Sequence, residues 1–262
     1  MKISGRTQML SRLPVSKVLE LYKRLGFESI EFGLLDINFH IRPDLIEDYI
    51  IAHNVERAQS LGLSISAVSN HLGYTQDDDV FEFHLNSIPK IKQFGTDVLI
   101  IAAGGISPID RQYNLELKNE FKRRTGVLCR AAEQNGVRLA IEPEPGQWVA
   151  TLDDFYELKE STGCNTLNMN MDIGHAFLME NSVEQAIIRA GKDIIHCHVE
   201  NMRRGEHLHL LPQEGEIDLL AAFKALKCVG FDGGMSLDLY VLPYEETAEE
   251  AIHYCNGLLT QL

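Results

Sequence analysis

The chain has 262 residues, the length of one closed (β/α)8 barrel, and 45% of them are hydrophobic, which is ordinary for a globular protein. Lys and Arg total 24 against 38 Asp and Glu, so the formal net charge is −14. Such an acidic surface repels phosphate backbones and disfavours binding to nucleic acid. No apolar stretch approaches the roughly 20 residues of a membrane span, and the first residues lack the apolar segment of a signal peptide. We therefore expect no membrane partner.

The predicted elements repeat a unit of amphipathic helix, glycine and apolar strand. In chain order the predicted strands are 2–5, 27–32, 63–68, 97–102, 137–142, 165–172, 193–199 and 231–239. Before the second to eighth strands stand glycines at which the helices are expected to stop, namely Gly26, Gly62, Gly95, Gly136, Gly163, Gly191 and Gly230. Eight alternating units at this length favour a parallel, closed (β/α)8 barrel. No linker or composition shift marks a second domain, so residues 1–262 are expected to form a single barrel domain.

Polar side chains end four of the predicted strands. Glu142, Asp172, His198 and Asp238 each lie on the polar side of a strict alternation with apolar residues. Strand side chains alternate between faces, so these four point away from the face that packs on the helices. Glu31, at the end of the second strand, shares that inward face. Because chemistry in such barrels sits at the carboxyl ends of the strands, the side chains are expected to meet at one mouth.

Three carboxylates and one imidazole brought together in this way would be costly to hold without a cation. The set contains no thiolate and suits Mn²⁺, Mg²⁺, Co²⁺ or Zn²⁺. The five cysteines are scattered and form no CxxC pair, which favours a reduced cytoplasmic location. A divalent-metal site is the prediction; the alternative is that each residue is a polar strand cap bonded to a neighbouring loop.

Other polar residues fall near the same mouth. His175, three residues beyond Asp172, could bind a second metal, contact substrate or orient its loop, and substrate contact is favoured. The long polar segment 201–216 carries His207 and His209, whose spacing can place two imidazoles on one cation. His71 shares the parity of the apolar residues of its strand and reaches the mouth only if the strand has already ended.

Two further residues have a functional and a packing interpretation. Arg6, just after the first strand, could meet a substrate phosphate or carboxylate, and an ion pair with Glu31 is the alternative. Trp148, the only tryptophan, could stack on a sugar face or pack over the barrel rim.

Four segments of the chain resemble the xylose-isomerase-like barrels. They are Ala140-Ile-Glu-Pro143, Asn170-Met-Asp-Ile-Gly-His175, Ile195-His-Cys-His-Val-Glu-Asn201 and His209-Leu-Leu-Pro-Gln-Glu-Gly-Glu-Ile-Asp218. That superfamily joins sugar (phosphate) isomerases and epimerases to apurinic-site endonucleases. The resemblance implies that Glu142, Asp172, His198 and Asp238 hold one divalent metal. It also implies substrate contacts from His175 and Arg203, to which we add Glu200.

The activity implied by the resemblance is isomerisation or epimerisation of a small sugar or polyhydroxy carbonyl compound through an enediolate. The metal would stabilise the enediolate as a Lewis acid, Glu142 would remove the proton, and Asp238 would return it from the opposite face. The family usually carries Glu at the last position, and Asp238 is one methylene shorter. The shorter side chain argues against two-base epimerisation more than against metal binding. It is compatible with a one-base isomerisation and with a lyase or dehydratase reaction.

A multi-metal hydrolase, such as a phosphoesterase or endonuclease, is the second hypothesis. In the endonuclease branch an extra metal is held by residues that correspond to His175, His207 and His209. Against this, the segment Ile101-Ala-Ala-Gly-Gly105 lacks the histidine found there in that branch, and the net charge of −14 opposes docking on DNA. We expect a small carbohydrate-like substrate, and leave assembly into a homo-oligomer open.

Overall fold

The computed structural model describes residues 1–34, 48–104, 114–240 and 242–262. Eight parallel strands close into a barrel in the order β1-β10-β7-β6-β5-β4-β3-β2. They are β1 (Lys2–Arg6), β2 (Ser29–Gly33), β3 (Ser64–Asn70), β4 (Val98–Ala102), β5 (Arg138–Glu142), β6 (Asn168–Asp172), β7 (Ile194–Val199) and β10 (Gly234–Leu237). The predicted (β/α)8 barrel is confirmed.

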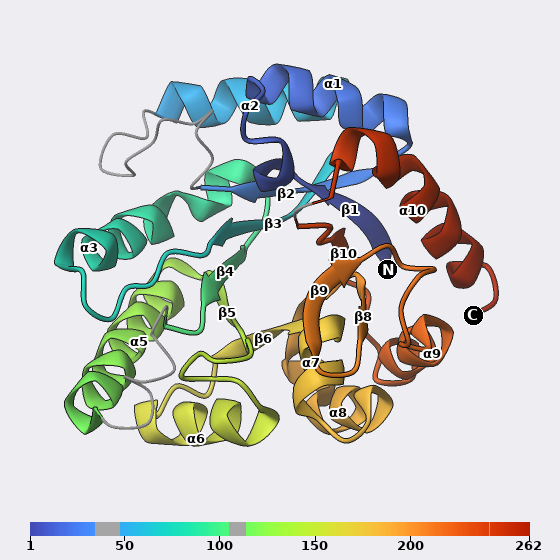
Figure 1. The fold of residues 1–262 in the computed structure, drawn as a ribbon. Helices are drawn as coiled ribbons and strands as arrows, with labels where there is room; N and C mark the ends of the chain where they lie inside the picture. The colour runs from blue at the N-terminus through green and yellow to red at the C-terminus, as the bar shows by residue number, and fades with distance from the viewer. Residues whose placement is uncertain (35–47, 105–113, 241) are drawn as a thin grey trace.

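Helices ring the strands on the outside, and both termini lie on the same side of the barrel (Figure 1). They are α1 (Val15–Leu25), α2 (Asp48–Ser60), α3 (Asp78–Ser87), α5 (Leu115–Asn135), α6 (Leu152–Thr162), α7 (Ile173–Met179), α8 (Val183–Ala190), α9 (Leu219–Cys228) and α10 (Tyr244–Leu259). Short 3-10 turns complete the set: η1 (Thr7–Leu10), η3 (Ile88–Phe94) and η4 (Gly191–Asp193). All seven glycines expected to stop helices have positive φ, as a left-handed stop requires. No helix in the described ranges combines the length and apolarity needed to cross a bilayer.

The interior of the barrel is unusually polar. Bulky branched residues fill most barrels of this kind, but here the small apolar cluster inside is Ala67, Val98, Ile100 and Ala140. Four polar residues of the barrel strands also have no exposed surface: Ser4, Asn170, His196 and Ser236. Small and hydrogen-bonding side chains therefore run along the barrel axis up to the carboxyl ends of the strands.

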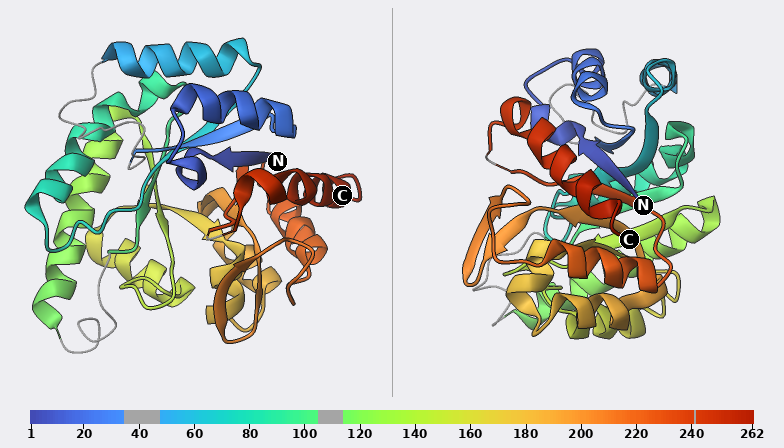
Figure 2. Two further views of the ribbon diagram at one scale, coloured as in Figure 1. Left: turned by 45° about the horizontal axis from the view of Figure 1, so that its top comes forward. Right: turned by 90° about the vertical axis from the view of Figure 1, so that its right-hand side faces the viewer.

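Two local features differ from the simple sequence pattern. Strand β3 has an irregularity against β2, where Ile30 pairs with Ile65 and the next residue, Glu31, pairs with Ala67. The extra residue reverses the parity of the rest of β3, so His71 faces the barrel axis. The segment after β7, expected as a long loop, forms an antiparallel hairpin of β8 (Asn201–Arg203) and β9 (Glu206–Leu210). The hairpin stands out from one end of the barrel (Figure 2).

Candidate active site

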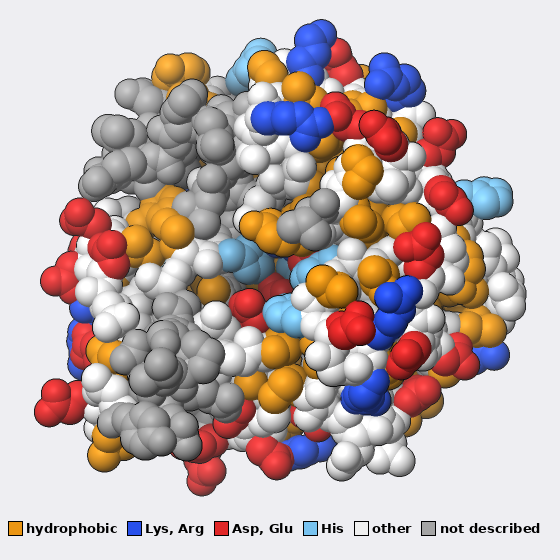
Figure 3. Space-filling view, in the orientation of Figure 1, with side chains coloured by type: hydrophobic (Ala, Val, Ile, Leu, Met, Phe, Trp, Pro, Cys, Tyr) orange, Lys and Arg blue, Asp and Glu red, His pale blue; other side chains and the backbone are white. Residues whose placement is uncertain are grey.

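The four strand-end residues singled out by the sequence lie together. Glu142 and Asp172 end β5 and β6, His198 is in β7, and Asp238 directly follows β10. One ligand atom from each lies within 4.8 Å of the others, and all four side chains are buried. Figure 3 shows acidic and histidine side chains gathered in a hollow at the centre of this face. Parallel strands place their carboxyl ends at one edge, which is why residues so distant in sequence converge here.

His198 is held with a defined ring orientation. Its Nε2 lies 3.0 Å from Glu31 Oε2, and its Nδ1 lies 3.2 Å from Glu142 Oε1. Nδ1 also lies 3.9 Å from Asp172 and 3.7 Å from Asp238. Metal-binding histidines commonly give their second ring N–H to a carboxylate, and Glu31 occupies that place. Burial and Arg6 lower the pKa of His198, but Glu142 and Glu31 outweigh them and raise it to about 10.

The carboxylates around His198 fit a divalent cation. Asp238 Oδ1 is buried and has no hydrogen-bond partner among the residues that the structure describes. Burial disfavours the charged form of Glu142, yet His198 and His71 hold its pKa well below the usual value. Three carboxylates and one imidazole nitrogen form an oxygen-rich ligand set of the kind that hard or borderline divalent ions take.

Arg6 reaches the same mouth from the end of β1. Its Nε lies 3.1 Å from Glu31 Oε1, and Nη1 forms a short ion pair with Asp238. Nη2 lies 2.9 Å from His71 Nε2, and the side chain is only 4% exposed. The packing alternative foreseen for Arg6, an ion pair with Glu31, is therefore present, and two carboxylates already neutralise the guanidinium.

A second group of histidines stands beside the first. Hairpin strand β9 brings His207 and His209 next to His175 at the start of α7, and the three offer ligand atoms within 4.8 Å of one another. His175 Nε2 lies 3.0 Å from His207 Nε2. His175 Nδ1 lies 3.0 Å from the carbonyl oxygen of Pro143, which orients the ring toward the hairpin.

Three residues expected as substrate contacts do not line the hollow of the mouth. Glu200 is fully buried, with a ligand atom within 4.8 Å of His209 and Asp238, and its Oε1 accepts a 2.7 Å hydrogen bond from the backbone N–H of Gly174. Arg203 lies on the hairpin with 53% of its side chain exposed, 4.0 Å from Glu206. Trp148 is 4% exposed and packs over Gly104 at the rim after β4, which is its packing alternative. Strand parity does not predict which side chains line the mouth once a barrel strand has ended.

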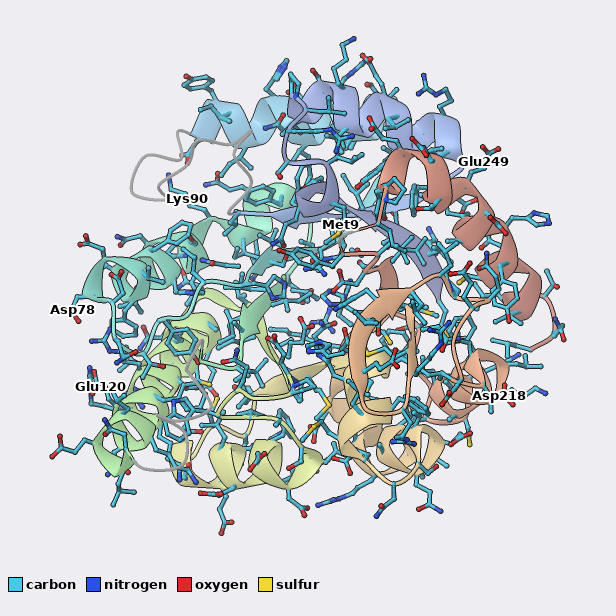
Figure 4. The ribbon with its side chains drawn as sticks, in the orientation of Figure 1. Met9, Asp78, Lys90, Glu120, Asp218 and Glu249 are labelled. Carbon is cyan, nitrogen blue, oxygen red and sulfur yellow. The ribbon has the colours of Figure 1, made fainter. Side chains whose placement is uncertain are left out.

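The mouth opens into a cavity of about 560 Å³. Sequence reasoning assigned no role to several of the residues that line it: Gln8, Met9, Glu144, Gln147, Leu208 and Tyr240. Figure 4 places Met9, from η1, near the barrel axis, whereas the labelled Asp78 and Glu249 lie at the periphery. Burial, together with the neighbouring charge of Glu142, raises the pKa of Glu144 to about 7. Its position two residues after the strand-end Glu142 was the available signal.

Comparison with known proteins agrees with this geometry. The family model described as "Xylose isomerase-like TIM barrel" matches residues 19–257. The chain belongs to this family. The resemblance drawn from four short segments therefore extends over nearly the whole barrel.

Two curated relatives that match most of this chain are named as an isomerase and an epimerase. Inosose isomerase from Bacillus velezensis is 25% identical over 252 residues, covering 89% of this chain and 86% of that protein. L-ribulose-5-phosphate 3-epimerase UlaE from Shigella flexneri is 22% identical over 252 residues, covering 93% and 88%. A crystal structure described as IOLI protein with a binding zinc atom has a TM-score of 0.76 at 21% identity, covering 100% of this chain and 97% of that one. The last comparison supports the fold.

Proposed function

We propose that this protein is a divalent-metal-dependent isomerase or epimerase of a small sugar or polyhydroxy carbonyl compound. The observation that carries the proposal is the convergence of Glu142, Asp172, His198 and Asp238 at the floor of the barrel mouth. The full-length similarity to an inosose isomerase and a ribulose-phosphate epimerase supports the same class of reaction. The five cysteines are free, which supports a reduced cytoplasmic setting.

Glu142 is the residue that we assign as base. Its low pKa keeps it ionised near neutral pH, and it lines the cavity beside His175, so it can accept a proton from a carbon next to a carbonyl. A divalent ion held by the four residues would act as a Lewis acid on the oxygens of the bound carbonyl compound. Mn²⁺, Mg²⁺, Co²⁺ and Zn²⁺ all suit the ligand set. His175 faces the same cavity and is proposed to contact substrate.

Asp238 is proposed as a ligand rather than as the second acid. Burial disfavours its charge, but Arg6 and His198 hold its pKa below the usual value. Arg6 holds Asp238 Oδ2 in an ion pair, and the side chain is one methylene shorter than the glutamate usual at this position. This geometry favours a one-base isomerisation, in which Glu142 removes and returns the proton on one face of the substrate.

The sharpest test is exchange of substrate C–H hydrogen with solvent deuterium. The purified protein with Mn²⁺ would be incubated with a panel of ketoses, inososes and their phosphates in D₂O and followed by NMR. We expect exchange with at least one compound and its loss in Glu142→Ala, with the exposed Glu157→Ala as the matched control that keeps it. Full exchange in the Glu142→Ala variant would refute the assignment of the base.

The histidine group favours one alternative, a multi-metal hydrolase. His175, His207 and His209 lie close enough to share a second cation. Metal counting on the purified protein separates the two functions: one bound ion supports the isomerase, and two or three support the hydrolase. His207→Ala distinguishes them independently, because it would remove the extra ion of a hydrolase and leave the four-residue site loaded.

A further inference from the structure

A chain of hydrogen bonds runs from Glu142 down into the barrel. Asn170 Nδ2 lies 3.0 Å from Glu142 Oε2, and Asn170 Oδ1 lies 2.9 Å from His196 Nδ1. His196 Nε2 lies 3.2 Å from Ser236 Oγ. Asn170, His196 and Ser236 have no exposed surface and do not line the mouth cavity. Asn170 is the member of this chain that contacts Glu142, and His196 Nε2 also lies 3.8 Å from Glu31 Oε2.

The chemistry of the chain fixes its direction. An ionised carboxylate only accepts hydrogen bonds, so the group of Asn170 that faces Glu142 must be the amide NH₂. The amide oxygen then faces His196 Nδ1, which must carry the proton, and His196 Nε2 must accept from the hydroxyl of Ser236. Each group has one consistent role, and His196 prevents the amide of Asn170 from turning over.

The two oxygens of Glu142 therefore have different partners. Oε2 accepts from Asn170, while Oε1 remains 3.2 Å from His198 Nδ1 on the side of the other carboxylates. We propose that Asn170 and His196 are positioning residues that hold the Glu142 carboxylate in the rotation in which Oε1 faces the ligand cluster. This inference rests on the proposed function, because it concerns the metal ligand and base of that reaction.

The test measures Mn²⁺ affinity by titration calorimetry, and the visible d–d spectrum of the protein saturated with Co²⁺, in Asn170→Leu. Leucine approximates the size of asparagine and removes the donor. We expect Mn²⁺ to bind about 10-fold or more weakly, and the Co²⁺ spectrum at saturation to change in band position and intensity, because Glu142 without its donor can turn and alter the coordination. His196→Ala should change both quantities in the same direction by less.

The other groups that face Glu142 are unchanged in these variants. His71, His175 and His198 have ring nitrogens 3.5, 3.7 and 3.2 Å from its oxygens, so a changed spectrum reports on the Asn170 donor. A purely structural effect would weaken binding without changing the spectrum of the saturated protein. Asn168→Leu is the matched control, since Asn168 is two residues earlier on β6 and donates to the backbone carbonyls of Thr166 and Leu139. It should leave the affinity within twofold of wild type and the spectrum unchanged.

The outcomes distinguish the positioning role of Asn170 from the proposed function. If wild type binds Mn²⁺ and Asn170→Leu binds it with the same affinity and gives the same Co²⁺ spectrum, the positioning role is refuted and the proposed function stands. If wild type binds no divalent ion, the proposed function falls and the positioning role with it. Thermal unfolding of each metal-free variant identifies any that fail to fold, and Asn170→Ala then replaces the one that is lost.

Discussion

Binding of a metal should displace a proton from His198, and the structure sets the size of the effect. The carboxylates Glu142 and Glu31 raise the pKa of the imidazole to about 10 against the opposing effects of burial and Arg6. A metal ion requires the neutral ring. Since pH 7 is about three units below that pKa, removing the proton from the ring costs roughly 4 kcal/mol. Mn²⁺ affinity should therefore rise about tenfold for each pH unit between pH 6 and 9.

Calorimetry in buffers of different ionisation enthalpy measures the protons released. We expect wild type to release close to one proton for each Mn²⁺ bound at pH 7. The weak binding that remains in His198→Gln should release none. His53→Gln, a substitution on helix α2 away from the barrel mouth, is the control and should release the same proton as wild type. Binding that releases no proton and is independent of pH would show that His198 is neutral or is not a ligand, and would refute this reasoning.

Three further predictions follow from the site and its surroundings. Asp238→Asn should weaken Mn²⁺ binding by more than about 100-fold, because it removes a ligand rather than a neighbour of one; affinity within tenfold of wild type would contradict that role. In Gly174→Ala the new Cβ would lie 2.1 Å from Glu200 Oε1, so urea unfolding should show a loss of about 2–4 kcal/mol, whereas wild-type stability would mean that Glu200 packs differently. Burial lowers the pKa of His84 in the folded protein to about 4. The unfolded chain therefore binds a proton at this residue at a higher pH than the folded protein does, and the free energy of unfolding falls as the pH drops from 6.5 toward 4. His84→Gln should recover about 2–3 kcal/mol of that acid loss, and equal pH profiles in the two proteins would exclude His84 as its source.

The polar residues at the strand ends could be predicted from the sequence because side chains along a strand alternate between its two faces. Once the chain is recognised as eight helix–strand units, parity alone predicts which side chains face the axis, and closure brings Glu142, Asp172 and His198 to one mouth. The same argument placed Asp238 beside them but inside an expected strand 231–239, whereas β10 ends at Leu237 and Asp238 directly follows it. These statements need only local alternation and the topology of the barrel.

Residues beyond the ends of the barrel strands escaped the same reasoning. Arg203 and Glu200 follow β7 closely in sequence, yet Arg203 is on the exposed surface of the hairpin and Glu200 is buried, bonded to the backbone of Gly174. The direction of a side chain beyond a strand end depends on the turn, and a turn is selected by contacts with distant segments. His71 was expected at the mouth only if its strand had already ended; β3 ends at Asn70, and one extra residue within β3 also reverses the parity of its last residues.

The sequence by itself determined the barrel, its strand order and the inward set at the strand ends, because these follow from periodicity and from the geometry of parallel sheets. Only the tertiary structure decided the partners of that set. It joined Arg6 to Glu31 and Asp238, turned the Nδ1 of His198 toward Glu142, and placed Asn170 beneath Glu142. Such pairings arise between strands far apart in the chain, where distance and ring orientation, rather than residue type, decide which groups exchange a proton or bind a cation.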